Sequence, residues 1–538
     1  MPFSQHLIIA PILLPLVAGA AMLLLNERRL IAKRSIALVA TSAMLAIAIL
    51  LLGQVAARGF GGARATTAYL VGNWPAPFGI VLVLDWLSAL MLVLTAVLGL
   101  SCLVFSFARW DRASPRFHAL FLFQLMGLNG AFLTGDLFNL FVFFEVLLAA
   151  SFALLLHGSG EARVKAALHY VSINVAASLL FLIGAALIYG VTGTLNMADL
   201  AARIPAQAEA GIGLLQSGMA VLGIAFLIKA GMWPLGLWLP RTYAAAAPPV
   251  AALFAILSKV GVYAVLRVYL LLLGHNTGWT ANFGEEWLLL GGIATLAFGT
   301  IGMLAARTLS RVAGYALLIS AGTLLATIGA GEGAVLGGAL FYLVSSTLAI
   351  AAFYLLIELV ERREADARTV TEPVFDDEYT GVTEEQENEV GIVIPATIAL
   401  LGGGFAFCAL LIAGLPPLSG FIAKFAIIDG LLNLRDSIGA PVWWLIALII
   451  GSGLATLIAT TRAGIDLIWT PSERPPPALR LTEALPVGAL LAVCLALMIF
   501  AGPAMRYMER TGNSLGDRQG YIESVLGAQR VTSSAKTR

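Results

Sequence analysis

Long apolar stretches separated by short polar connections run from near the start of the sequence to about residue 503. A helix needs roughly 17 or more mostly apolar residues to cross a bilayer, and fourteen stretches reach that length. The pattern therefore predicts an all-α polytopic membrane protein of about fourteen transmembrane helices. The stretches lie at about 7–26, 34–53, 79–107, 116–134, 136–157, 163–191, 210–239, 247–273, 285–305, 311–330, 334–360, 392–430, 441–469 and 482–503.

The connections between these stretches share their basic residues unequally. The odd-numbered connections contain eighteen Lys and Arg residues, whereas the even-numbered ones contain four. Cytoplasmic loops of membrane proteins carry the excess of Lys and Arg. We therefore expect the odd-numbered connections in the cytoplasm and both termini outside, with the first stretch retained as an uncleaved span.

Two connections and the tail are longer than the others. Residues 53–78 are predicted to fold over the outer face, and the tail after Pro503 is polar and contains no span. Residues 361–389 are rich in Asp and Glu and are predicted to form a solvated cytoplasmic linker. A docking role for this linker on a partner protein stays open.

The composition excludes several classes of protein. With 59% hydrophobic and 12% charged residues, the chain lacks the polar surface of a soluble protein of 538 residues. No basic face or tail indicates nucleic-acid binding. The sequence contains no phosphate-binding loop, dinucleotide fingerprint or metal-spaced Cys/His cluster, so we expect no cofactor and no metal. Any redox or ATP energy source is expected on another chain.

Lysine use points to candidate chemistry inside the membrane. The chain has six lysines, and three of them, Lys229, Lys259 and Lys424, lie deep in apolar stretches. A charge in the hydrocarbon costs about 2.5–3.5 kcal/mol on insertion scales. Arginine keeps its proton under essentially all conditions, whereas a buried lysine can lose it. The three lysines are therefore candidate proton carriers; the alternative is that each only pairs with a carboxylate to hold helices together.

Prolines break two of the lysine-bearing stretches. Pro234 follows Lys229 in stretch 7, and Pro416 and Pro417 precede Lys424 in stretch 12. If stretches 4–8 and 9–13 form two five-helix units, each broken stretch is the fourth of its unit. Because five is odd, the units have opposite topology, as in the inverted repeats of many transporters. The alternative is two unrelated proline kinks.

This repeat divides the chain into four predicted parts. Residues 1–115 carry the first three helices, and residues 116–273 carry the first repeat. Residues 274–470 carry the second repeat with the acidic loop 361–389, and residues 471–538 carry the last helix and the polar tail.

Other polar groups in apolar stretches are further candidates. Glu145 lies about nine residues into stretch 5, near the middle of the bilayer, and Lys229 is its predicted partner. The pair is a proton site or a structural ion pair. His169 in stretch 6 is a possible relay or a satisfied core histidine. Asp85 is expected to cap a helix.

Three further charged residues lie near the ends of predicted spans. Arg267 is expected to snorkel, with its aliphatic part among apolar groups and its guanidinium at the membrane–water interface. Glu358 is expected to face water. Asp429 is a candidate exit site beyond Lys424.

At four segments the sequence resembles the proton-translocating antiporter-like subunits shared by respiratory complex I and the Mrp-type (Pha/Mnh) cation/proton antiporters. They are FNLFVFFEVL around Glu145, LIKAGMWPLGLWLP around Lys229, APPVAALFAILSKVGVYAVLRV around Lys259, and GLPPLSGFIAKF around Lys424. The resemblance covers about residues 80–470. Within the family, NGAFLTGDLFNLFVFFEVLLAAS is similar to the D subunits of Mrp-type antiporters.

The resemblance implies a mechanism. Glu145, Lys229, Lys259 and Lys424 would form a polar axis along the membrane plane. Loss of the Glu145 charge would weaken the hold of Lys229 on its proton, which would pass to Lys259 and toward Lys424. Complex I relatives carry histidines at positions matching Gly236 and Tyr243, so a histidine relay at those two positions is not expected here.

The resemblance also implies a setting for the chain. It would be a secondary transporter subunit rather than an enzyme, in the bacterial inner membrane, with other membrane subunits, protons and Na⁺ or K⁺ as partners. Two alternatives stay open: a proton-pumping subunit of a respiratory NADH:quinone oxidoreductase, and a non-transporting scaffold.

Overall fold

The computed structural model describes residues 6–530 except 115, 159, 208, 275–279, 332, 369–395, 435–438 and 466–478. Most of the predicted acidic loop therefore lies outside the described residues.

The N-terminal part contains three long helices and a small hairpin. The elements are α2 (Ala10–Leu24), α3 (Leu30–Phe60), β1 (Thr67–Leu70), η1 (Val71–Asn73), β2 (Val81–Leu84) and α4 (Trp86–Ser106). The two strands pair antiparallel, with Thr67 opposite Leu84. The stretch predicted as one span from residue 79 thus begins with a strand. Asp85 starts α4 through a capping box with Ser88, which confirms its predicted capping role.

The next part, residues 110–273, contains the first broken helix. Its elements are η2 (Trp110–Arg112), α5 (Phe117–Leu133), α6 (Leu137–Leu155), α7 (Glu161–Thr192), α8 (Met197–Arg203), η3 (Ile204–Ala206), α9 (Glu209–Ala230), α10 (Trp238–Ala245), α11 (Pro248–Val268) and η4 (Tyr269–Leu273). Predicted span 7 is therefore two helices, α9 and α10, joined by an irregular segment.

The following part contains the second broken helix. Its elements are α12 (Glu285–Ala305), α13 (Leu309–Gly329), α14 (Gly333–Arg368), α15 (Ala396–Ala413), α16 (Ser419–Leu432) and α17 (Ala440–Gly464). Predicted span 12 is likewise split, into α15 and α16.

The C-terminal part ends in two short helices. After α18 (Leu481–Ile499) come α19 (Ala501–Gly516) and α20 (Arg518–Leu526). Along the described chain, eleven helices are long and apolar enough to cross a membrane, and three shorter apolar helices accompany them at 10–24, 117–133 and 397–413. Neither α19 nor α20 is among these helices.

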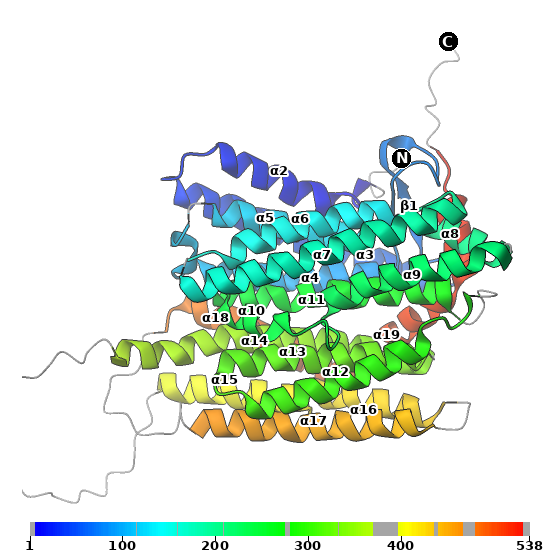
Figure 1. Cartoon of the computed structure of the whole chain (residues 1–538). Coiled ribbons are helices and arrows are strands. Elements are labelled where there is room, and N and C mark those ends of the chain that lie inside the picture. The colour runs from blue at the N-terminus through cyan, green and yellow to red at the C-terminus, as the bar shows by residue number, and fades with distance from the viewer. Residues whose placement is uncertain are drawn as a thin grey trace, which may run out of the picture.

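The helices lie side by side in an elongated bundle, from α2 at one edge to α17 at the other (Figure 1). At one end of the bundle lie the β hairpin, α8, α19 and α20; we call it the hairpin end. At the opposite end lie the first turns of α3 and α7, which carry Arg34 and Arg163, and the connection that carries Arg109; we call it the arginine-rich end. Because successive helices alternate in direction, α9 runs away from the hairpin end, whereas α15 and α16 run toward it (Figure 1).

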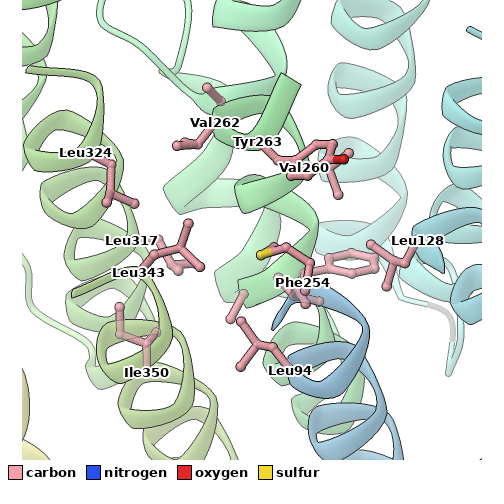
Figure 2. Close-up of a cluster of buried hydrophobic side chains, with 14 of the residues drawn as sticks. Leu94, Leu128, Phe254, Val260, Val262, Tyr263, Leu317, Leu324, Leu343 and Ile350 are labelled. Carbon is pink, nitrogen blue, oxygen red and sulfur yellow. The ribbon is translucent and has the colours of Figure 1, made fainter. Parts of the chain in front are cut away.

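Three helices form the centre of the bundle. α11, α13 and α14 are buried on almost every side, whereas α3, α7 and α12 each leave one apolar face exposed, as expected for helices that border lipid. Figure 2 shows part of this core, where Phe254 of α11 lies near Leu94 and Leu128, and Leu317 and Leu343 lie on the opposite side. Polar side chains in this centre therefore lie far from both water and lipid.

Candidate functional site: buried lysines across the bundle

The break after α9 begins at a glycine. Gly231 has φ of 82°, a left-handed conformation that glycine adopts without steric cost. The N–H groups of Gly231 and Met232 both donate to the carbonyl of Leu227, at 3.0 Å each, which ends the helix. The N–H of Trp233 then donates to Thr295 Oγ1 of α12 at 2.9 Å. The break is therefore anchored to a helix of the following part of the chain.

The break after α15 repeats this geometry. Gly414 has φ of 78°, and the N–H groups of Gly414 and Leu415 both donate to the carbonyl of Leu410, at 3.0 and 3.1 Å. In each break a proline follows three residues after the glycine, Pro234 in one and Pro417 in the other. The two broken helices therefore end in the same way.

Lys424 is buried at the second break. Its side chain is 7% exposed, and Nζ donates to the carbonyl oxygen of Ala413, the last residue of α15, at 2.8 Å. Carbonyls of a last helical turn lack partners within the helix, and this helix end carries partial negative charge. The break thus supplies a polar partner for an ammonium group at membrane depth.

Lys259 lies at the centre of the bundle on α11 and is fully buried. Its Nζ donates to Ser320 Oγ of α13 at 2.7 Å, and Ser320 Oγ lies 2.9 Å from Ser346 Oγ of α14. No carboxylate forms an ion pair with Lys259 among the described residues. A lysine held only by hydroxyl groups has no fixed counter-charge, which suits a group that gains and loses a proton.

A second serine pair lies beside the first. Ser345, the chain neighbour of Ser346, lies with its Oγ 2.8 Å from Ser419 Oγ of α16, and α16 also carries Lys424. The first pair thus joins α13 to α14 next to Lys259, and the second joins α14 to the helix of Lys424; no hydrogen bond between described residues joins the two pairs. These serines were not predicted as site residues; the signal that could have found them was the adjacent pair Ser345–Ser346 inside an apolar stretch.

Glu145 and Lys229 lie near each other without direct contact. Glu145 on α6 accepts a short hydrogen bond from Ser178 Oγ of α7. The Lys229 ammonium lies 4.9 Å from the ring centroid of Phe144, a favourable cation–π position. In the described part of the chain no ion pair joins Glu145 to Lys229, although the carboxylate is close enough to act on the ammonium through its charge. The predicted pair is therefore separated in this conformation.

A small cavity lies beside Lys229. Its volume is about 20 Å³, and its polar lining comes from Tyr170, Asn174, Lys229 and Tyr243. That volume accommodates about one water molecule. The cavity gives the ammonium group a polar neighbour on the side toward α10.

The structure does not bring His169 to this row of groups. His169 is on the exposed face of α7, whereas the next residue, Tyr170, is buried. At Gly236 a Cβ would lie 1.9 Å from the carbonyl oxygen of Gly231, so this backbone admits no side chain there. Asp429, the exit candidate, is exposed and accepts a hydrogen bond from Asn433.

Two predictions about charged residues were wrong. Arg267 does not reach outward: it is 5% exposed and donates to both carboxylate oxygens of Asp85, at 2.5 and 2.9 Å. Glu358 does not face water: it is 9% exposed and pairs with Arg362 at 3.0 Å and with Arg109 at 3.4 Å. Burial of Arg267 is favourable because Asp85, distant in the sequence, pairs with it. Burial of Glu358 is favourable because Arg109, also distant, and Arg362, one helical turn away, pair with it.

These features define a polytopic helical membrane protein with titratable groups at membrane depth, an arrangement that marks ion pathways. Residues 134–455 match the family described as NADH:quinone oxidoreductase/Mrp antiporter, transmembrane. The chain belongs to this family.

Three relatives show how far the similarity extends. The chain is 53% identical over 537 residues to the D subunit of a probable K⁺/H⁺ antiporter of Rhizobium meliloti (strain 1021), covering 98% of this chain and 99% of the relative. It is 34% identical to the D subunit of the Na⁺/H⁺ antiporter of Alkalihalophilus pseudofirmus, covering 97% and 99%. A chain of the Mrp complex structure from Dietzia sp. DQ12-45-1b is 26% identical, with a TM-score of 0.82 and coverage of 98% and 100%.

Proposed function

We propose that this chain is the proton-translocating membrane subunit of a multi-subunit monovalent cation/proton antiporter that exchanges Na⁺ or K⁺ for protons. The observation that carries the proposal is the set of three lysines at membrane depth, Lys259 and Lys424 buried and Lys229 half-buried, which are held by hydroxyl and carbonyl groups or an aromatic ring rather than by ion pairs with carboxylates. The near full-length similarity to relatives named as D subunits of cation/proton antiporters supports it.

The proposed architecture has fourteen spans, with the three shorter apolar helices crossing as well. Residues 116–273 and 274–470 form two five-helix units of opposite orientation, between an N-terminal part, 1–115, and a C-terminal part, 471–538. The identical helix ends at Gly231 and Gly414 support the repeat, as do the opposite directions of the two broken helices (Figure 1).

In the proposed mechanism Glu145 controls the charge of Lys229. When Glu145 is ionised it stabilises the ammonium, and when it is neutralised the proton of Lys229 is free to move to Lys259. From Lys259 the Ser320 and Ser346 hydroxyls, followed by Ser345 and Ser419, lead toward Lys424. Each step changes the charge next to the following lysine in a medium of low dielectric constant, where such changes act strongly.

The proposed setting places the arginine-rich end in the cytoplasm and both termini outside, in accord with the distribution of basic residues. The membrane is the bacterial inner membrane, and other membrane subunits of the antiporter are the partners. The acidic segment 369–389 would then emerge in the cytoplasm.

Antiport by the assembled complex in membrane vesicles tests the proposal. Lys229→Ala and Glu145→Ala should abolish Na⁺- or K⁺-driven proton movement while the complex still assembles. Lys165→Ala is the matched control, since Lys165 is exposed and pairs only with Glu161 on its own helix. Antiport at the wild-type rate in Lys229→Ala would refute the proposal.

The family description also includes NADH:quinone oxidoreductase, so a proton-pumping subunit of such an enzyme is the second candidate. Copurification with redox subunits and quinone-dependent proton movement would favour it. A scaffold role instead predicts that Lys229→Ala reduces assembly as much as transport.

A further inference from the structure

Two tyrosine hydroxyls in the bundle are buried without a partner. Tyr243 of α10 is 0% exposed and Tyr354 of α14 is 3% exposed, and neither hydroxyl has a hydrogen bond with any described residue. A buried hydroxyl left unpaired costs about 1–3 kcal/mol. Buried polar groups of this kind are ordinarily satisfied by internal water. The two tyrosines therefore present hydroxyls that an internal water would satisfy.

Tyr243 faces the cavity beside Lys229. The cavity of about 20 Å³ is lined by Tyr243 and Lys229 together, with Tyr170 and Asn174 completing its polar surface. The Tyr170 hydroxyl is already bonded to Ser151 Oγ at 2.6 Å, and the Asn174 amide donates to a carbonyl of its own helix. Tyr243 is thus the cavity hydroxyl that is free to bond a water next to the lysine.

Tyr354 continues from Tyr243 toward the arginine-rich end. One turn further along α14 is Glu358, which lies at the arginine-rich end with Arg362 and Arg109.

The end of α10 lies beside these charged side chains. Arg163 donates to the carbonyl of Ala245, the last residue of α10, at 3.0 Å. The guanidinium groups of Arg163 and of Arg109, which pairs with Glu358, both lie over the Trp110 ring, at 5.3 and 5.0 Å from its centroid. The two tyrosines therefore lie between these charged side chains at the arginine-rich end and the cavity of Lys229.

We propose that the hydroxyls of Tyr354 and Tyr243 form the proton inlet that connects the arginine-rich end to Lys229. The inlet rests on the proposed transport function. A proton arriving from the arginine-rich end binds the Tyr354 oxygen as that hydroxyl releases its own proton toward Tyr243. Tyr243 repeats the exchange with the cavity water, which protonates the Lys229 amine. Each tyrosine ends neutral, and one proton has moved from the arginine-rich end to the lysine.

Tyr→Phe substitutions separate this role from a structural one. They keep the ring that fills the space, and they remove a hydroxyl that bonds no described residue, so folding and assembly should be unaffected. A tyrosine that only fills space would give wild-type transport after the change. A hydroxyl that passes protons would not.

The experiment compares the antiport rates of Tyr243→Phe, Tyr354→Phe and the double variant in vesicles containing the assembled complex. We expect each single variant to be slower by roughly tenfold, below the usual 10²–10⁴-fold effect of a positioned proton-transfer group because water partly replaces the hydroxyl. The solvent deuterium isotope effect should increase as proton transfer becomes limiting. Tyr243→His should restore much of the rate, since imidazole both accepts and donates a proton. Tyr189→Phe is the control, because Tyr189 is 55% exposed on α7.

The outcomes separate the two proposals. Wild-type rates and isotope effects in both single variants and the double variant, with Lys229→Ala inactive, would overturn the inlet and leave the transport function intact. Antiport retained in Lys229→Ala would overturn the transport function itself. Slowing by Tyr189→Phe equal to that by Tyr243→Phe would also overturn the inlet.

Discussion

The ion pair between Arg267 and Asp85 makes a quantitative prediction about stability. Both side chains are 6% exposed, and two hydrogen bonds join them. The guanidinium also lies 5.6 Å from the ring centroids of both Tyr263 and Tyr521. Arg267→Met removes the charge and leaves the Asp85 carboxylate buried without its partner.

The expected cost follows from that uncompensated charge. Breaking a buried pair by removing one partner destabilises a protein by about 3–5 kcal/mol. Since every 1.4 kcal/mol is a factor of ten, the unfolded fraction should rise by about 10²- to 4 × 10³-fold. The loss should appear as a lower midpoint when the detergent-solubilised complex is heated and its remaining monodisperse fraction is measured.

A double variant tests whether the charge is the cause. Asp85→Asn keeps a side-chain oxygen that can cap α4, so combining it with Arg267→Met removes both charges and preserves the cap. The double variant should be more stable than Arg267→Met alone, because paired residues couple by about 0.5–3 kcal/mol. If the double variant is no more stable than Arg267→Met, the reasoning is refuted.

Three other changes probe separate parts of the structure. Ser346→Ala should slow antiport several-fold by interrupting the hydroxyl connection beyond Lys259, whereas Thr347→Val should not; equal rates in the two variants would contradict this. Gly236→Ala should reduce the yield of assembled complex, because a Cβ there meets a backbone carbonyl oxygen at 1.9 Å; normal yield would count against the close approach. Burial tends to raise the pKa of the Asp111 carboxyl. The opposing interactions with His118 and Arg34, including the Arg34 charge, outweigh burial and hold this pKa below its usual 3.8. The ionised form therefore stabilises the fold at neutral pH, and this contribution is lost as the pH falls below about 3.8. Asp111→Asn should flatten that acid loss in a thermal-stability series against pH, and an unchanged acid slope would contradict it.

The hydrophobic pattern predicted the helices well because the bilayer imposes a minimum apolar length on every span. Each predicted stretch corresponds to at least one helix, and the prolines correctly located the breaks after Lys229 and before Lys424. Burial of Lys259 and Lys424 was predicted for the same reason, since a charge inside a long apolar run has no aqueous surface to reach, whereas Lys229 is only half-buried. These are local properties of the chain, and a sequence displays them directly.

Partners distant in the chain were not predictable from one sequence. Arg267 and Asp85 are separated by 182 positions, so the position of Arg267 near a helix end favoured an outward orientation that the fold overrides. The serine bridge from Lys259 requires α11, α13 and α14 to meet, which no local pattern encodes. The β hairpin before α4 was missed because its second strand, VLVL, is as apolar as the helix that follows.

The positions of the lysines relative to the two helix breaks bear on how the two broken helices are related. Lys229 precedes Gly231, whereas Lys424 follows Gly414, yet both lysines lie on the hairpin-end side of their breaks because the two helices run in opposite directions (Figure 1). A faithful inverted duplicate of the first unit would have placed its lysine on the other side of the break. In the proposed inverted repeat the two lysines are therefore not at equivalent sequence positions, so one broken helix cannot replace the other by simple exchange.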